Sequence, residues 1–311
     1  MLCSYYAIIK KPYVPRDRFG SSKEVFVKQR DNLKRHFFLA AIVISLILLL
    51  GGELLLLPLL RYFQSRISDE GTIFLMRYSL SLGIWPTTLL YCKYAEKDTF
   101  NSFKIADRGG RKGNTFKNLL IGLFTGFVLN GLCALTALLH GDLSFSFSSF
   151  DIIYLVIGLI AVFIQSGAEE LVARGYLYSV IESRYGVVTA FVTNTLFFTV
   201  LHGGNHGITF LAVSQMILIS ILLSIFVWHY DSLWMAMGLH TAWNYTQSLL
   251  LGLPNSGIVS QKSLLHLDAA SDSIFYSAAF GLEGGITASV LLIVIISFIF
   301  FRIKRSRPGI F

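Results

Sequence analysis

The sequence has few charged residues and few cysteines. Only 14% of its 311 residues are charged, whereas a soluble domain carries about 25%. In addition, 54% are hydrophobic and the mean hydropathy is +0.63, which excludes soluble and disordered classes of protein. The cysteines Cys3, Cys92 and Cys133 are scattered, odd in number and without CxxC spacing. They therefore indicate neither a disulfide framework nor a thiolate metal site. We predict an all-α, polytopic membrane protein.

Long apolar runs give the number of predicted helices. A bilayer core needs roughly 20 apolar residues per helix, and eight runs qualify or come close. The fourth run is long enough to protrude from the bilayer, and the fifth is short. The predicted transmembrane helices cover residues 37–60, 72–92, 116–139, 151–181, 187–203, 208–229, 232–252 and 284–301.

The net charge of +8 reports orientation. Twenty of the 26 Lys and Arg residues lie in the N-terminal arm, in the loop 93–117 and after the last span. An even number of spans puts these three segments on one side, which the positive-inside rule makes cytoplasmic. We therefore predict cytoplasmic termini, the lipid bilayer as a partner and no nucleic-acid partner. The predicted organisation is a basic arm 1–36, a transmembrane domain 37–302 and a basic tail 303–311.

Two adjacent carboxylates and an arginine lie inside the fourth span. Ionisable side chains in a membrane are costly and are candidates for function. Glu170 and Arg174 are four residues apart and share a helical face, whereas Glu169 points about 100° away. This spacing predicts that Arg174 holds Glu170 while Glu169 carries out chemistry.

Two further spans carry paired polar positions four residues apart. Phe198 and His202 share a face of the fifth span, and His240 and Asn244 share a face of the seventh. A lone histidine in a helix is more often a packing group than a ligand or a base. Two such faces together with the acidic pair favour one site formed by three spans.

The pattern Glu169-Glu170-x-x-x-Arg174, Phe198-x-x-x-His202 and His240-x-x-x-Asn244 resembles the three motifs of the CPBP family. This family groups CAAX prenyl proteases with bacteriocin-processing and immunity (Abi) proteins. The resemblance covers residues of about 150–250 and implies an intramembrane endopeptidase that acts on a peptide or membrane protein. The order and spacing of the motifs are more similar to prokaryotic members, which implies a prokaryotic cell membrane.

The resemblance also implies roles for these residues. Glu169 takes a proton from water, and His202 orients that water. His240 and Asn244 donate hydrogen bonds to the oxyanion, and Arg174 with Glu170 holds the acidic helix. Glu169, His202 and His240 also satisfy the ligand count of a catalytic zinc site. Because no HExxH pattern is present, a metal-free mechanism is favoured, and metal dependence stays open.

Two other classes of function are compatible with these residues. One is a non-proteolytic bacteriocin-immunity or regulatory scaffold that binds a partner through the same cluster. The other is a proton-coupled transporter, in which Glu53 and Arg77 could extend a proton path through Glu169, Glu170 and Arg174. The sequence shows no repeat of the kind that many transporters have.

Overall fold

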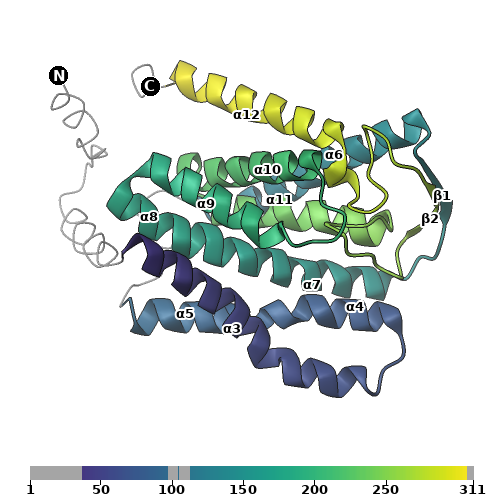
Figure 1. Ribbon diagram of the computed structural model, residues 1–311, viewed down its shortest axis with the longest axis horizontal. Coiled ribbons are helices and arrows are strands. Elements are labelled where there is room, and N and C mark those ends of the chain that lie inside the picture. Colours follow the sequence, from purple (N-terminus) through teal and green to yellow (C-terminus); the bar gives the residue numbers. More distant parts are fainter. Residues whose placement is uncertain (1–36, 97–103, 105–112, 307–311) are drawn as a thin grey trace.

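The protein is a bundle of helices that run side by side (Figure 1). The computed structural model describes residues 37–96, 104 and 113–306. The predicted basic arm 1–36, most of the basic loop (97–103 and 105–112) and the end of the tail (307–311) lie outside the described residues.

Five helices among the described residues are long and apolar enough to cross a membrane. Many of their leucine, isoleucine and phenylalanine side chains point outward, as expected where lipid replaces water around a helix. The prediction of a mostly helical, polytopic membrane protein is therefore confirmed. The five are α3 (Phe38–Gln64), α6 (Phe116–His140), the long helix Ile152–Tyr185, α10 (Phe210–His229) and α12 (Ile286–Ser306).

The other three predicted spans are also helical, but each is short or interrupted. The second consists of α4 (Glu70–Ser79), a 3₁₀ turn η1 (Leu80–Gly83) and α5 (Ile84–Tyr94). The fifth is α9 (Val187–His202), and the seventh is α11 (Leu233–Tyr245) with a π-helical turn η3 (Thr246–Leu250). The start of α3 and the end of α12 lie on the same side of the bundle (Figure 1).

The central helix of the bundle is longer than a bilayer is thick. It consists of α7 (Ile152–Glu170), a π-helical segment η2 (Leu171–Leu177) and α8 (Tyr178–Tyr185). The Asp151 side chain accepts a hydrogen bond from Tyr154 N and caps the start, and Gly186, with φ of 87°, follows the end. At 1.5 Å per residue, 34 residues span about 51 Å against a hydrocarbon core of about 30 Å. This helix therefore extends beyond the bilayer.

Glycines let α6 and α11 approach closely. A Cβ atom on Gly122 would lie 2.2 Å from Met235 O, and one on Gly126 would lie 2.3 Å from Leu239 O. On the opposite helix, a Cβ atom on Gly238 would lie 2.5 Å from Leu119 O. Small residues at such crossings allow backbone-to-backbone packing in membranes. The packing holds α11, which carries His240 and Asn244, against α6.

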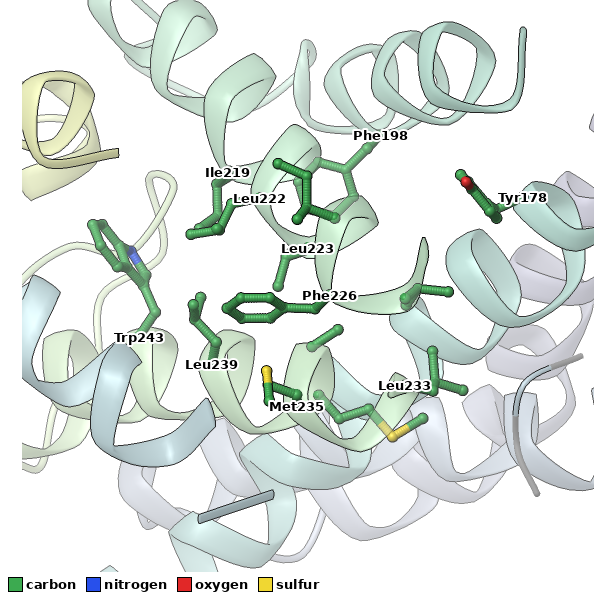
Figure 2. Packing of buried hydrophobic residues seen from close by; sticks show 14 of the residues in the cluster. Tyr178, Phe198, Ile219, Leu222, Leu223, Phe226, Leu233, Met235, Leu239 and Trp243 are labelled. Atoms are coloured by element: carbon green, nitrogen blue, oxygen red, sulfur yellow. The ribbon is translucent and has the colours of Figure 1, made fainter. Parts of the chain in front are cut away.

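Apolar side chains from α10 and α11 fill the interior (Figure 2). Leu222, Leu223 and Phe226 of α10 pack with Met235 and Leu239 of α11, and all five are buried. Their contacts fix α10 against the helix that carries the third motif.

The all-α prediction missed one small sheet. Strand β1 (Leu143–Phe147) pairs antiparallel with β2 (Leu265–Ala270), at one end of the bundle (Figure 1). The segment LSFSF alternates apolar and polar residues with the two-residue period of a strand. Its partner is more than 100 residues away in the sequence, so local patterning could not reveal the pairing.

Candidate active site

Glu170 and Arg174 form a fully buried ion pair. Arg174 Nη1 donates to Glu170 Oε1 at 2.8 Å, and neither side chain is exposed. The other terminal nitrogen, Nη2, donates to Ser220 Oγ on α10 at 2.8 Å. The guanidinium also lies 4.4 Å from the centre of the Phe198 ring. The contact predicted from the i,i+4 spacing is therefore present, and two other helices support it.

His240 joins the third motif to the first. Its Nδ1 lies 2.9 Å from Glu170 Oε1. A carboxylate that already accepts from an arginine can only accept again, so this ring nitrogen is the donor. The other nitrogen, Nε2, lies 3.8 Å from Glu169 Oε2. One histidine thus contacts the paired carboxylate and faces the unpaired one.

His202 faces Glu169 from α9. Its Nδ1 lies 2.9 Å from the carbonyl oxygen of Phe198, and because a carbonyl only accepts, Nδ1 carries the hydrogen. In the neutral ring, Nε2 is then an acceptor, and this atom lies 3.9 Å from Glu169 Oε2. The His202 ring also lies against the Phe198 ring, with 4.5 Å between their centres.

Glu169 has one engaged and one free carboxylate oxygen. Oε1 accepts a short hydrogen bond from Gln165 Nε2. Among the described residues, no donor reaches Oε2, the oxygen that faces both histidines. The side chain is 24% exposed, whereas Glu170 is enclosed. The two adjacent glutamates therefore differ in their surroundings, and a chemical role for Glu169 stays a prediction.

Asn244 faces α7 one turn beyond His240. Its Nδ2 donates to Ser166 Oγ at 3.2 Å and lies 3.5 Å from Gln165 Oε1. Its contacts are therefore with two neighbours of Glu169 in the turn before it. All six residues of the predicted site thus lie in one connected group: Glu169, Glu170, Arg174, His202, His240 and Asn244.

Two of the three helices that carry the site, α7 and α11, change to π-helix beside it. The segment Leu171–Leu177 follows Glu170, and Thr246–Leu250 begins two residues after Asn244. Such segments loosen the regular hydrogen-bond ladder and occur often at functional sites. In the first of them, Asn194 Nδ2 of α9 donates to Ala173 O at 2.5 Å. This bond ties α9 to the segment that carries Arg174.

Residues 151–246 match the family described as type II CAAX prenyl endopeptidase Rce1-like. The resemblance predicted from the three motifs is confirmed. The matched segment is about a third of the chain and contains all six site residues. The similarity supports an intramembrane endopeptidase. No curated protein and no solved structure matches the chain significantly.

Several polar residues around the matched motifs were not assigned a role from sequence. Gln165 and Ser166 contact Glu169 and Asn244, and Ser220 supports Arg174. Gln165 has a detectable signal, because it lies four residues before Glu169. Ser220 has none, because several serines occur along α10 and only the packing shows which one meets the arginine.

Two residues considered for a proton path lie on α3 and α4, and Glu53 is within electrostatic range of Glu169. Glu53 on α3 accepts a hydrogen bond from Ser81 Oγ at 3.1 Å, and Arg77 is exposed on α4.

Among the described residues, no group of three or more His, Cys, Asp or Glu side chains is arranged to hold a metal ion. The zinc ligand set of Glu169, His202 and His240 stays a prediction.

Proposed function

We propose that the protein is an intramembrane endopeptidase in which Glu169 activates the water that hydrolyses a peptide bond. One observation carries the proposal: the free oxygen of Glu169 faces Nε2 of His202 at 3.9 Å and Nε2 of His240 at 3.8 Å. These separations exceed a direct hydrogen bond and suit an oxygen atom held between polar groups.

Two hydrogen-bond acceptors orient the water molecule that attacks the substrate. Water can donate one hydrogen to Glu169 Oε2 and the other to His202 Nε2, so that its lone pair faces the substrate carbonyl carbon. As the C–O bond forms, Glu169 takes the proton. When the tetrahedral intermediate collapses, the C–N bond breaks and Glu169 returns the proton to the leaving amine. No acyl-enzyme is formed.

The developing oxyanion needs preorganised donors. When both ring nitrogens of His240 carry hydrogen, Nδ1–H donates to Glu170 and Nε2–H can donate to the oxyanion. Asn244 Nδ2 carries two N–H groups, and the one directed at Ser166 Oγ can be exchanged for the substrate oxygen while the contact with Gln165 is kept. One such donor is typically worth about 3–4 kcal/mol in the barrier.

Glu170 and Arg174 serve as a positioning pair in this proposal. The carboxylate fixes the His240 ring through Nδ1, and the arginine fixes the carboxylate. Removing either partner would leave an uncompensated buried charge beside the site.

We also propose eight spans with cytoplasmic termini in a prokaryotic cell membrane, from the basic segments and from the order and spacing of the motifs.

The test compares the peptides of cells that express wild type, Glu169→Ala or Glu70→Ala. Glu70 lies at the exposed start of α4 and serves as the matched control. We expect cleavage products that require Glu169 but not Glu70, and each product is then made as a peptide, with and without a prenyl group, for assay with purified protein. Identical peptide sets in all three strains contradict the endopeptidase.

The Glu169→Ala variant also separates the protease from a scaffold, when protection or signalling is measured beside cleavage. A bacteriocin-immunity or regulatory scaffold binds its partner through the cluster without hydrolysis. Protection or signalling that survives Glu169→Ala, together with no detectable cleavage by wild type, favours the scaffold over the enzyme.

A further inference from the structure

Gln165 lies one helical turn before Glu169 and contacts two parts of the site. Its Nε2 donates to Glu169 Oε1. Its Oε1 accepts from Ser166 Oγ at 3.1 Å and lies 3.5 Å from Asn244 Nδ2. The side chain is half-buried, and it connects the proposed base to the proposed oxyanion donor on α11.

The surroundings decide the orientation of the carboxamide. A rotation by 180° would place its oxygen against the carboxylate of Glu169 and its NH₂ group against the NH₂ group of Asn244. Both contacts would then be repulsive, because each would join groups of the same hydrogen-bonding kind. In the observed orientation both ends are satisfied, so the network itself assigns which atom faces Glu169.

The position of Gln165 explains why the two oxygens of Glu169 differ. A carboxylate can rotate about its last bond and present either oxygen. A donor on Oε1 resists this rotation and leaves Oε2 toward His202 and His240. The same carboxamide gives Asn244 an acceptor on the α7 side. The base and the oxyanion donor are thus held by one side chain.

We propose that Gln165 is a positioning residue that sets the rotation of the Glu169 carboxylate and aligns Asn244 with it. This inference rests on the endopeptidase function proposed above. It predicts that Gln165 acts on the rate of the chemical step and not on substrate binding, because its polar atoms are engaged with Glu169, Ser166 and Asn244.

The experiment measures kcat and KM for the full-length protein in lipid nanodiscs, with a cleavable peptide identified as above. Gln165→Met keeps the length and volume of the side chain but removes its polar contacts with Glu169, Ser166 and Asn244. We expect kcat to fall by up to about 100-fold, the loss typical of misplaced reacting groups, with little change in KM.

Two further variants keep the test decisive. Gln165→Glu keeps an acceptor for Asn244 but places a second carboxyl group against Glu169 in place of the donor, so we expect kcat to fall with little change in KM. Gln215→Met makes the same chemical change at a buried position of α10 outside the cluster, and it should leave kcat unchanged. If Gln165→Met does not fold, Gln165→Glu gives the answer.

The outcomes distinguish the inference from the function beneath it. Wild-type kcat in a folded Gln165 variant overturns the positioning role, while loss of cleavage in Glu169→Ala still supports the enzyme. A rise in KM with unchanged kcat also overturns it, in favour of substrate binding. Absence of any cleavage that depends on Glu169 removes the proposed function and the inference together.

Discussion

Glu169 and Glu283 are two glutamates near α11 with opposite surroundings. Glu283 lies in the turn Leu282–Gly284 before α12, outside the segment that matches the endopeptidase family. Its Oε1 accepts from Trp243 Nε1 at 3.2 Å, and its Oε2 accepts from the backbone N and Oγ of Ser256 at 2.8 and 2.7 Å. Glu169 keeps one oxygen without a donor among the described residues.

The comparison separates a carboxylate that joins segments from one that is available for chemistry. Glu283 is buried, and its three hydrogen bonds connect the loop around Ser256 to Trp243 of α11. Both oxygens of Glu283 accept hydrogen bonds within the protein, so this carboxylate stabilises structure. Glu170 also has an oxygen without a donor, but it is enclosed and paired with Arg174. Glu169 differs from Glu170 because its side chain is 24% exposed, although the oxygen without a donor is itself enclosed in both residues.

The largest expected effect is the loss of cleavage in Glu169→Gln. The amide keeps the size of the side chain but cannot take a proton from water. Because general-base catalysis contributes about 10²–10⁴-fold, we expect a loss of this order in kcat with a folded protein. His202→Ala and His240→Ala should also abolish cleavage. Peptide hydrolysis by purified protein checks this, and full activity in any one variant removes that residue from the mechanism.

The sequence predicted the local part of this site and missed the rest for a physical reason. Glu170 with Arg174, and Phe198 with His202, are four residues apart, so helical geometry alone brings them together. Ser220 meets Arg174 across 46 residues, and Asn194 meets Ala173 across 21. Such contacts depend on how helices pack, which the period of a single helix does not contain.

The fold shows the same limit. All eight predicted runs are helical, because apolar length is a local property of the sequence. The π-helical segment Leu171–Leu177 and the pairing of β1 with β2 were not predicted. Both depend on neighbours that are distant in the sequence, such as the side chain of Asn194 and the strand Leu265–Ala270.

The second effect in size concerns the buried ion pair. Arg174→Leu removes the partner of Glu170 and leaves a buried charge uncompensated, which costs about 3–5 kcal/mol in stability. We expect a large fall in the midpoint of thermal unfolding, whereas Glu169→Gln should change it little. The double variant Arg174→Leu with Glu170→Leu should recover part of the loss. No recovery would mean that Ser220 and Phe198 are the contacts of Arg174 that matter.

Glu283→Gln should give the reverse of Glu169→Gln. The amide cannot accept from all three donors, so the expected loss is about 1–3 kcal/mol in stability, with kcat within a few-fold of wild type.

Burial raises the pKa of Glu283 above its ordinary value of 4.5. The folded state thus holds the proton more tightly, and this contribution to stability is full below pH 4.5 and falls as the pH rises through the folded pKa. Thermal unfolding at several pH values should show this slope in wild type and not in Glu283→Gln. If Glu283→Gln is stable but inactive, Glu283 also takes part in catalysis, and the distinction drawn between the two glutamates is wrong.

The smallest expected effect lies at the start of α7, at the other end of that helix from Glu169. Lys262 Nζ donates to Asp151 Oδ2 at 2.8 Å, and this bond lowers the pKa of Asp151 below its ordinary value of 3.8. Its contribution to stability is therefore present above pH 3.8 and is lost as the pH falls through the folded pKa. Asp151→Asn keeps an N-cap for Tyr154 N but removes the charge, so it should lower the unfolding midpoint slightly at pH 7 and not at the acid end of the range. Because both side chains are partly exposed and screened by solvent, high salt should reduce the difference. If the difference in unfolding midpoint between wild type and Asp151→Asn is the same at all pH values, the charge of Asp151 does not contribute and the carboxylate acts only as a helix cap.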